Sequence, residues 1–562
     1  MPIPEVVDPI SINSKDPIPT ENSSSSVRNE REDRSDDLNS KPSSESSESA
    51  SVPDNTGLPI VPKPDIGLPR AGRRKNRNGS EEKSRINMAI DLAKELQLFF
   101  FHTPEGEAFA SLPVHDHRET FALEDRSFEN FFASTFYAKE KVNLPKKDFV
   151  EVRSIFIGEA LYKGPEKRVH IRLAEKDGFI YLDLGNKEWE MVRVSKNGWE
   201  ITKTAPVIFR RVRGMKSLPR PTKGGSIEDL RPYINVTDEK SWVLVIAFLI
   251  AALRPVGPYP ILAIEGEQGS AKSTTSEVLR RLIDPSTAPL RSAPRDERDL
   301  IISASNSACL AFENLSSVPP WLSDALCRMA TGSGFSTRRL YSDADEKLFD
   351  AARPVILNGI HIGISNGDLF DRSLIVRAPA ISEQTRRTEA EFWREFDKGQ
   401  PGILGALLDA VACALGRIAT LKLPTLPRMA DFAAWATAAE PALGWRDGTF
   451  LDAYSTNRQA ASELSLENSP LLGPIENLLR ERESWEGTAS MLLVLLLEFA
   501  RTDHLPMKNW PGSAGSLSGM LRRLRPSLKA VGIHLEFDQT SGRNSKKIIR
   551  LTRDLGGENS GH

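Results

Sequence analysis

Residues 264–275 read IEGEQGSAKSTT and separate two segments of different periodicity. The preceding PILAIE is a short apolar run typical of a buried strand, and the following STTSEVLRRLI repeats its apolar residues at helical spacing. Between them, Gly266, Ala271, Lys272 and Ser273 follow the spacing G-x-x-x-x-G-K-[ST], except that alanine replaces the second glycine. The pattern predicts a strand, a phosphate-binding loop and a helix, which together belong to a parallel α/β sheet.

In such a loop, backbone N–H groups point inward at the phosphates of ATP, and the positive end of the helix assists them. Lys272 is expected to contact the phosphates and Ser273 to bind Mg²⁺. Alanine at position 271 is acceptable if the backbone there is already right-handed as it enters the helix. A structural Gly/Ser loop is the alternative. The predicted nucleotide-binding residues are Gly266, Glu267, Gln268, Gly269, Ser270, Ala271, Lys272, Ser273 and Thr274.

Three further apolar runs carry polar residues at their ends. Glu313 follows SACLAF and is expected to coordinate Mg²⁺, with an ordinary strand-end residue as the alternative; Asn314 stands where many ATPases carry a second acid. Asn358 ends RPVILN and is either a polar sensor of the γ-phosphate or part of a tight Asn-Gly turn. Arg372 precedes SLIVR and either reaches the nucleotide of a neighbouring subunit or pairs locally with Asp371.

Composition divides the chain into segments. The polar N-terminal segment, rich in Ser, Pro, Asn, Asp and Glu, predicts a disordered tail that ends in the basic patch RAGRRKNR, either a nucleic-acid contact or a solvated linker. A helical stretch and alternating segments broken by KDG and KNG then predict an α+β accessory domain. The predicted boundaries are 1–82 for the tail, 83–225 for the accessory domain, 226–383 for the ATPase, 384–470 for a helical region, 471–553 for a DNA-binding unit and 554–562 for a second tail.

Several classes of protein are disfavoured. The net charge is −2, so any affinity for nucleic acid must come from local basic clusters. Three unpaired cysteines argue against disulfides and zinc and favour a cytoplasmic protein. The apolar run Trp242–Leu253 is too short to span a membrane, which needs about 18 residues, and it predicts a buried helix. His115 and His117 lie two residues apart but have no further ligands nearby in the sequence, which disfavours a metal site there.

Two basic clusters predict contacts with DNA. In GSGFSTRRLYSDADE and the residues after it, Arg338, Arg339 and Lys347 surround Tyr341, a mixture suited to gripping a phosphate backbone; a solvated hairpin is the alternative. Near the C-terminus, a predicted helix and two strands joined by TSGRN have the layout of a winged helix, which binds either duplex DNA or protein. Its basic residues are Arg522, Arg523, Arg525 and Lys529 on the helix, and Arg543, Lys546, Lys547 and Arg550 on the hairpin.

The segments EGEQGSAKSTT, FENLS, WLSDALCRMATGSGFSTRRLYSDADEKLFDAARPVILNGI and DLFDRSL resemble the ATPase core of AAA+-type superfamily 3 helicases. Within that superfamily, the segments resemble the primase-helicase-like proteins of phages, plasmids and integrative elements. The chain is also similar to a group of bacterial mobile-element ATP-binding proteins, from about residue 90 to the C-terminus. The resemblance implies a multidomain α/β fold with a P-loop AAA+-like core and a homo-oligomeric, possibly hexameric, ring.

The same resemblance assigns roles to residues. It implies that Lys272 and Ser273 form the first nucleotide motif, that Glu313 belongs to the second, and that Asn358 is the sensor asparagine. Arg372 falls where the superfamily places an arginine that acts on the neighbouring subunit. The STRRLYSDADEKLF segment corresponds to a hairpin that contacts single-stranded DNA in the channel of the ring.

The leading functional prediction is an ATP-dependent and Mg²⁺-dependent DNA helicase or translocase that replicates a mobile genetic element. The alternatives are a nucleotide-controlled DNA-binding switch at an origin or promoter, and a defence ATPase with little turnover. Asn314 departs from the acidic pair of the family and favours the switch, whereas Asn358 and Arg372 favour the motor. The N-terminal region shows no acidic pair placed like a primase metal site, so primer synthesis is not predicted.

Overall fold

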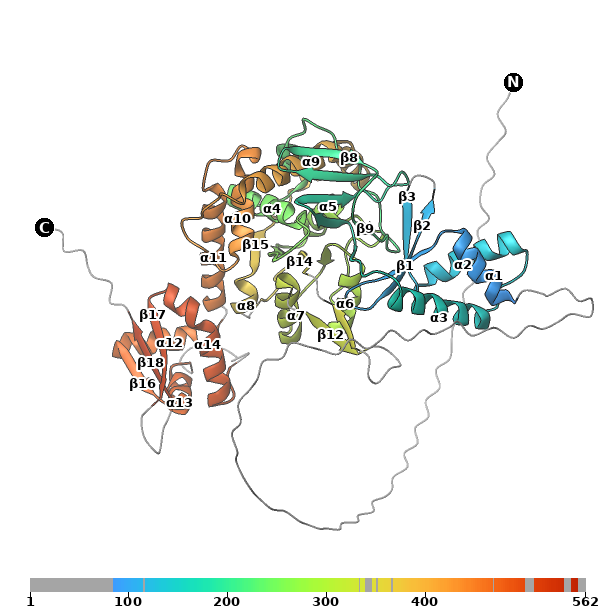
Figure 1. Cartoon of the computed structure of the whole chain (residues 1–562). Coiled ribbons are helices and arrows are strands. Elements are labelled where there is room, and N and C mark those ends of the chain that lie inside the picture. Colours follow the sequence, from blue (N-terminus) through green and yellow to red (C-terminus); the bar gives the residue numbers. More distant parts are fainter. Residues whose placement is uncertain are drawn as a thin grey trace, which may run out of the picture. The chain divides into compact units, whose positions relative to one another are not determined.

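A computed structural model describes most of the chain (Figure 1). The described residues are 84–114, 117–332, 334–338, 346–349, 352–364, 367–467, 469–500, 510–539 and 547–553. The predicted tails, the basic patch RAGRRKNR and His115 lie outside them.

The centre of the fold is a four-stranded sheet in the order β11-β14-β10-β15. All three strand pairs are parallel, which confirms the α/β prediction for this region. The strands are almost wholly apolar because helices cover both faces of the sheet. Their bounds are β10 (Ile261–Glu265), β11 (Leu310–Phe312), β14 (Val355–Gly359) and β15 (Ser373–Arg377).

Side chains of each strand alternate between two hydrophobic cores, as the pleat requires. Leu262 and Ile264 face the core that contains α4 and α5, whereas Ile261 and Ala263 face α6 and α7. The predicted buried helix at 242–253 is confirmed, since the side chains of α4 from Trp242 onward are buried. The helices are α4 (Glu239–Ala252), α5 (Lys272–Ile283), α6 (Glu297–Ser305), α7 (Pro320–Thr331) and the short α8 (Gly367–Phe370).

A helical region follows the sheet, as predicted. It contains η2 (Glu383–Thr385), α9 (Glu389–Arg417), α10 (Ala430–Ala439), η3 (Glu440–Leu443) and α11 (Thr449–Glu467). Within the described residues, α9 alone has the length and apolar composition of a membrane-crossing helix. Its residues Phe396, Leu404 and Leu408 are buried in the same core as α4, which is the packing expected of a core helix.

The N-terminal part of the described chain has a core of its own. An antiparallel sheet in the order β1-β2-β3 packs with three helices around buried phenylalanines, among them Phe128, Phe132 and Phe156. The elements are α1 (Arg85–Glu95), β1 (Phe99–His102), β2 (Ala108–Val114), β3 (His117–Ala122), α2 (Arg126–Glu140) and α3 (Lys146–Tyr162). A short parallel pair, β4 (Val169–His170) and β9 (Ile208–Phe209), follows.

A second antiparallel sheet, β5-β6-β7-β8, contains the hairpins predicted from KDG and KNG. Its strands are β5 (Leu173–Lys176), β6 (Phe179–Asp183), β7 (Met191–Ser195) and β8 (Gly198–Thr202), and η1 (Ile227–Tyr233) follows them. Leu182 and Val192 of this sheet are buried in the core that holds α4 and α9. A third, small core contains Ala174, Tyr181 and Phe209. The described residues of 83–225, expected to form one accessory domain, are therefore divided among three cores.

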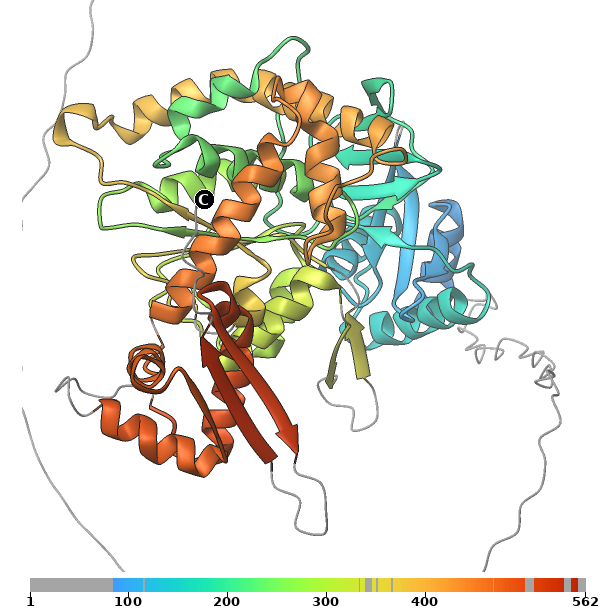
Figure 2. The same cartoon turned by 90° about the vertical axis from the view of Figure 1, so that its left-hand side faces the viewer.

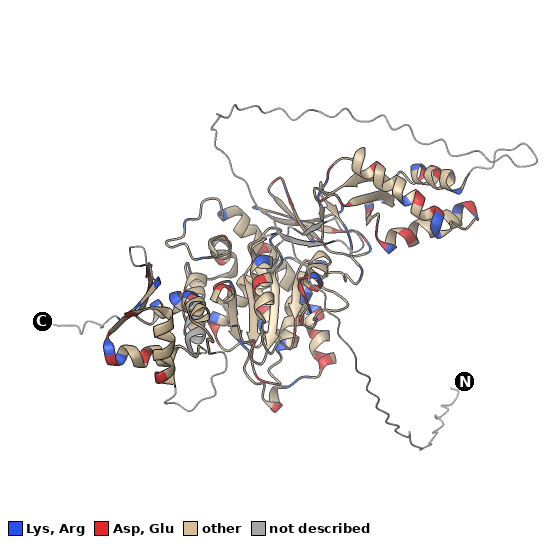
Figure 3. Ribbon diagram, turned by 90° about the horizontal axis from the view of Figure 1, so that it is seen from below, with Lys and Arg blue, Asp and Glu red and all other residues tan. Residues whose placement is uncertain are grey.

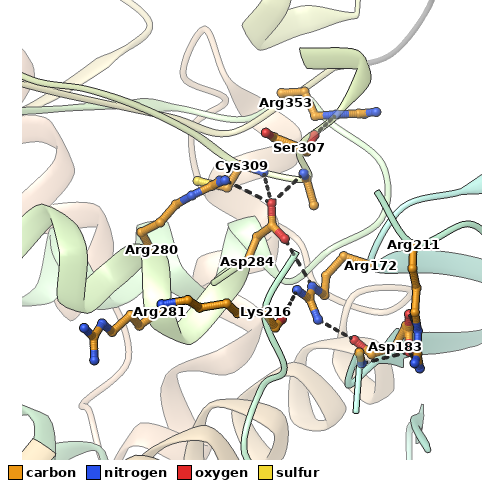
Figure 4. Close-up of polar contacts among 12 residues, drawn as sticks. Arg172, Asp183, Arg211, Lys216, Arg280, Arg281, Asp284, Ser307, Cys309 and Arg353 are labelled. Atoms are coloured by element: carbon orange, nitrogen blue, oxygen red, sulfur yellow. Dashed lines mark hydrogen bonds and ion pairs between the residues drawn. The ribbon is translucent and has the colours of Figure 1, made fainter. Parts of the chain in front are cut away.

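A buried polar cluster joins this second sheet to the end of α5 (Figure 4). The guanidinium of Arg172 is fully buried and donates to Asp284 Oδ1 (3.2 Å) and to the carbonyl oxygens of Asp183 (3.0 Å) and Lys216 (2.7 Å). Asp284, directly after α5, also accepts the N–H of Ala308 (2.8 Å) at the start of the β11 segment. The cluster thus fixes α5 to two neighbouring parts of the fold.

The C-terminal unit contains the predicted helix followed by two antiparallel strands. Figure 2 shows β17 and β18 as a long antiparallel pair, and β16 completes a sheet in the order β16-β18-β17. Leu517, Leu521 and Leu528 of α14 lie in the core of this unit. Its elements are α12 (Leu472–Arg482), β16 (Ser484–Gly487), α13 (Ala489–Ala500), α14 (Ala514–Ala530), β17 (Ile533–Gln539) and β18 (Lys547–Arg553).

Candidate functional site

The glycine loop (residues 266–271) connects β10 to α5 at the carboxyl edge of the parallel sheet. The observed order of strand, loop and helix is the one that the sequence predicts. Because β11, β14 and β10 run parallel, the residues that follow β11 and β14 lie at the same edge as the loop. Backbone N–H groups at the start of α5 carry the partial positive charge that favours an anion.

Two residues of the glycine loop require glycine. A Cβ on Gly266 would lie 2.3 Å from the carbonyl oxygen of Ala378, a contact that no side chain tolerates. Gly269 has a φ of +81°, in the left-handed region. Ala271 also has left-handed angles, φ 54° and ψ 27°, so the right-handed backbone that would make alanine acceptable there is not what the structure has. Alanine at this position costs about 1 kcal/mol that glycine would avoid.

The ammonium group of Lys272 lies across the loop. Its Nζ donates to the carbonyl oxygen of Glu267 (2.7 Å) and to Ser270 Oγ (3.3 Å), while Ser270 Oγ donates to the same carbonyl oxygen (2.8 Å). Partial burial lowers the pKa of Lys272. Since a charged phosphate oxygen is a stronger acceptor than these neutral oxygens, an anion in the loop would take over the ammonium group. Ser273 and Thr274 are half-buried in the first turn of α5.

Asn235, in the segment before α4, forms a hydrogen bond with the backbone of the loop. Its Nδ2 donates to the carbonyl oxygens of Ser270 (2.9 Å) and Pro379 (2.7 Å), and so joins the loop to the segment after β15. The backbone of Gly266 donates to the carbonyl oxygen of Gly359 (3.3 Å) on β14. Sequence reasoning missed Asn235, because a lone asparagine before a helix carries no recognisable pattern.

Glu313 and Asn358 lie at the same sheet edge as the loop. Glu313 is half-buried directly after β11, and its N–H donates to the carbonyl oxygen of Arg291 (2.9 Å). Asn358 is a fully buried residue of β14, paired in parallel with Ile264, so the tight-turn alternative is wrong. Its Nδ2 donates to Ser276 Oγ of α5 (2.9 Å), and its Oδ1 accepts the N–H of Asn314 (3.2 Å). The side chain thus ties the residues after β11 to the helix that follows the loop.

Arg372 lies directly before β15, at the amino ends of the parallel strands, whereas the glycine loop lies at their carboxyl ends. Its guanidinium pairs with Asp368 (2.7 Å) and is largely buried, with 17% of the side chain exposed. The expected local partner, Asp371, is wrong: Asp371 instead pairs with Arg428 (2.7 Å) and Arg458 (3.4 Å). Arg372 is therefore one member of a mixed cluster of arginines and aspartates.

Two of the residues predicted to contact single-stranded DNA lie on a hairpin. β12 (Phe335–Arg338) and β13 (Glu346–Phe349) pair in antiparallel register, with Thr337 opposite Lys347. The predicted hairpin is therefore present in the described strands, which include Arg338 and Lys347. Arg339 and Tyr341 lie outside the described residues.

The C-terminal helix α14 presents a basic stripe opposite its buried leucines. Arg522, Arg525 and Lys529 are exposed, and their spacing of three and four residues places them on one face of the helix. Arg522 also lies over the ring of Phe537, 4.8 Å from its centroid. Figure 3 shows Lys and Arg interspersed with Asp and Glu along the described elements.

The predicted basic hairpin of the same unit is less clearly basic. Lys547 is exposed at the start of β18, but Arg550 pairs with Glu486 (2.8 Å) and Glu536 (3.5 Å). Arg523 belongs to α14, whereas Arg543 and Lys546 lie outside the described residues.

His117, one of the two N-terminal histidines, has an aromatic and an acidic neighbour. His117 stacks on the ring of Trp189, with 4.6 Å between the centroids, and lies 3.5 Å from Glu119. No group of three potential ligands from His, Cys, Asp and Glu occurs within the described residues.

Residues 227–460 match the family model for the actinomycete integrative conjugative element replication protein. Residues 473–559 match the model for the C-terminal domain of the same protein. Over these residues the chain belongs to that replication-protein family. The first match includes the parallel sheet, the glycine loop, the β12–β13 hairpin and most of the helical region, and the second includes the basic stripe of α14.

Among solved structures, the replication protein is similar to three apo structures of the NrS-1 C-terminal region, two of them in an A form. The identities are 11–13% and the TM-scores 0.36–0.37, with 84% of this chain and 100% of each structure covered. No curated protein matches the chain.

Proposed function

We propose that this replication protein is an ATP-dependent DNA helicase or translocase that serves the replication of its integrative element. The observation that carries the proposal is the glycine loop: Gly266, Gly269 and the left-handed Ala271 shape a turn that leads into α5, and Lys272 lies across it. This arrangement offers a triphosphate both backbone donors and a cation, at the sheet edge where P-loop proteins bind nucleotides. The parallel sheet and loop support a P-loop AAA+-like core.

Magnesium and ATP are the proposed ligands of this site. Lys272 would contact the phosphates, and Ser273 and Glu313 would hold Mg²⁺, which supplies charge stabilisation during phosphoryl transfer. Asn358 acts as a positioning residue in this proposal, because its amide fixes Asn314, and with it the neighbouring Glu313, relative to α5.

The position of Arg372 supports an oligomer. Arg372 precedes Ser373, the first residue of β15, which pairs with Ile261, the first residue of β10, whereas the glycine loop follows the last residue of β10. Five strand residues separate these two edges by about 16 Å, so Arg372 lies too far from the loop of its own chain to act on that nucleotide. Its proposed target is the nucleotide of a neighbouring copy, as in a ring of about six subunits.

Two elements are proposed to bind DNA. The β12–β13 hairpin would contact single-stranded DNA in the channel of the ring, through Arg338, Arg339 and Lys347. The C-terminal unit would be a winged helix, because three helices alternate with a small antiparallel sheet ending in the β17–β18 hairpin. The exposed stripe of Arg522, Arg525 and Lys529 would then contact duplex phosphates or the major groove.

A nucleotide-controlled DNA-binding switch is the second candidate. Asn314 stands where a second acid would orient the attacking water, and its amide cannot accept a proton as a carboxylate can. Slow hydrolysis with retained ATP binding would suit a protein that assembles at an origin and stays there.

Binding and turnover measurements on the full chain test these proposals. We expect Mg²⁺-dependent ATP binding by calorimetry, lost or weakened in Lys272→Ala, and ATP turnover that rises several-fold when single-stranded DNA is added. Lys422→Ala, which changes an exposed lysine between α9 and α10, is the control and should behave like the unaltered protein.

Each outcome separates the candidates. Turnover stimulated by DNA supports the motor, and ATP binding without stimulated turnover supports the switch. If the unaltered chain binds no ATP in the presence of Mg²⁺, both proposals are wrong.

A further inference from the structure

The segment that follows β15 lies against the glycine loop. This segment, residues 378–388, is called the strap below. The carbonyl oxygen of Ala378 faces Gly266 so closely that a Cβ there would lie 2.3 Å away. Asn235 bonds both the loop and Pro379, and the N–H of Ile381 donates to the carbonyl oxygen of Gly269 (3.5 Å). The strap therefore contacts the loop directly at Gly266 and Gly269, and is joined to Ser270 through Asn235.

Near its end the strap carries an arginine beside the loop. Nη2 of Arg386 lies 3.4 Å from the position that a Cβ on Gly269 would occupy. Arg386 is exposed, and no carboxylate of the described residues pairs with it. The next residue differs: Arg387 pairs with Glu395 (3.2 Å) on the first turns of α9. Only one of these two adjacent arginines therefore keeps its charge available at the loop.

We propose that Arg386 binds the phosphate chain of the nucleotide held by the glycine loop of the same chain. A guanidinium beside the loop can give a phosphate two charge-assisted hydrogen bonds, in addition to those from the backbone donors of the loop and α5. This inference rests on the proposed nucleotide site, and it gives Arg386 a role within one chain, in contrast to Arg372 at the far edge of the sheet. The strap would then form a wall of the phosphate site.

Competition binding on the full chain tests this inference. We would titrate Mg²⁺-ATP and inorganic tripolyphosphate, each as a competitor of a fluorescent ATP analogue, against the unaltered protein, Arg386→Ala, Arg386→Lys and Arg387→Ala. Loss of one charged hydrogen-bonding partner should weaken binding by about tenfold or more. Arg386→Ala should weaken the binding of ATP and the binding of tripolyphosphate by the same factor, because the lost contact is to phosphate.

The other variants sharpen the test. Arg386→Lys should recover part of the affinity, since an ammonium group keeps the charge but loses the fork of two donors. Arg387→Ala should bind both ligands like the unaltered protein. Thermal melting without nucleotide should be the same for all variants, because both arginines are exposed.

The outcomes distinguish the two levels of the proposal. If the unaltered chain binds ATP and Arg386→Ala binds it equally well, the inference about Arg386 is wrong and the nucleotide site stands. Weaker ATP binding with unchanged tripolyphosphate binding would also overturn it, because the contact would then be to the base or sugar. If the unaltered chain binds neither ligand, the inference and the proposed function both fail.

Discussion

Replacing Asp284 with alanine should destabilise the core that supports the glycine loop. Asp284 follows α5 directly and is 4% exposed. It accepts hydrogen bonds from Arg172 Nε (3.2 Å) and the N–H of Ala308 (2.8 Å), and pairs with Arg280 Nη2 (3.2 Å). One carboxylate therefore pairs with two buried guanidinium groups and accepts the backbone N–H groups of Ala308 and Cys309, so it joins three separate segments.

The structure sets the size of the expected effect. Arg172 is 0% exposed and Arg280 is 2% exposed, so the Asp284→Ala variant would leave two positive charges in the core without their counter-ion. Removing one partner of a buried ion pair costs about 3–5 kcal/mol. Asp284→Asn should lose less, because its carbonyl oxygen can still accept the N–H of Ala308.

Urea unfolding of the full chain measures this cost. With a slope of about 1–3 kcal/mol per molar urea, the midpoint of the transition that reports the α4–α5 core should fall by about 1 M or more in Asp284→Ala. Asp397→Ala is the matched control, since Asp397 is 60% exposed and pairs with Arg281 at 3.5 Å. An exposed pair of this kind contributes about 0–1 kcal/mol.

The same carboxylate predicts a dependence on pH. Burial pushes the pKa of Asp284 upward, but Arg280, Arg172 and the N–H of Ala308 outweigh it and hold the pKa below its ordinary value of 3.8. The unfolded chain therefore takes up the proton first as the pH falls. The free energy of unfolding that Asp284 contributes is fully present above pH 3.8, the pKa of this group in the unfolded chain. It is lost as the pH falls through the lower pKa of the folded chain.

The urea comparison decides whether Asp284 stabilises the core. If Asp284→Ala and Asp397→Ala unfold at the same urea concentration, the reasoning is refuted.

Three further predictions concern the loop, a half-buried histidine and Arg372. Ala271→Gly should raise the free energy of unfolding by about 0.5–1 kcal/mol in urea titrations, since relief of the left-handed strain exceeds the entropy cost of glycine; a lower value would contradict this. Burial, assisted by two arginines, lowers the pKa of His170 from its ordinary 6.5 to about 4. The unfolded chain therefore binds the proton first, and the free energy of unfolding should fall by about 2 kcal/mol between pH 7 and pH 5. In urea titrations over this pH range, His170→Gln should flatten the slope. Mixing Arg372→Ala with Lys272→Ala subunits should restore part of the ATP turnover that each variant lacks, and an inactive mixture would argue against action on a neighbouring copy.

Local sequence predicted the elements of the candidate site well. The order of strand, glycine loop and helix follows from apolar periodicity and from the spacing of Gly266 and Lys272, because both are set within about twenty consecutive residues. The hairpins at KDG and KNG were predictable for the same reason. Backbone angles could not be predicted in the same way, because nothing in the sequence indicated that Ala271 would have left-handed angles.

Contacts between distant segments decided the remainder. Asn235 clamps the loop across 35 residues, Asn358 bonds Ser276 across 82, and Arg172 reaches Asp284 across 112. A sequence pattern reports the periodicity of one segment and carries no information about which distant side chains face each other. The partner of Arg372, the charge left available on Arg386 and the burial of the β5–β8 sheet against α4 were therefore visible only in the folded chain.

The sequence by itself determined that this replication protein contains a parallel α/β unit with a glycine loop after an apolar strand, and a C-terminal unit with a basic helix. Both follow from the intrinsic geometry of the backbone and the burial of apolar side chains at regular spacing. The tertiary structure alone decided which polar groups meet at the loop, because the free energy of buried hydrogen bonds and ion pairs depends on partners that folding brings together from far apart in the chain.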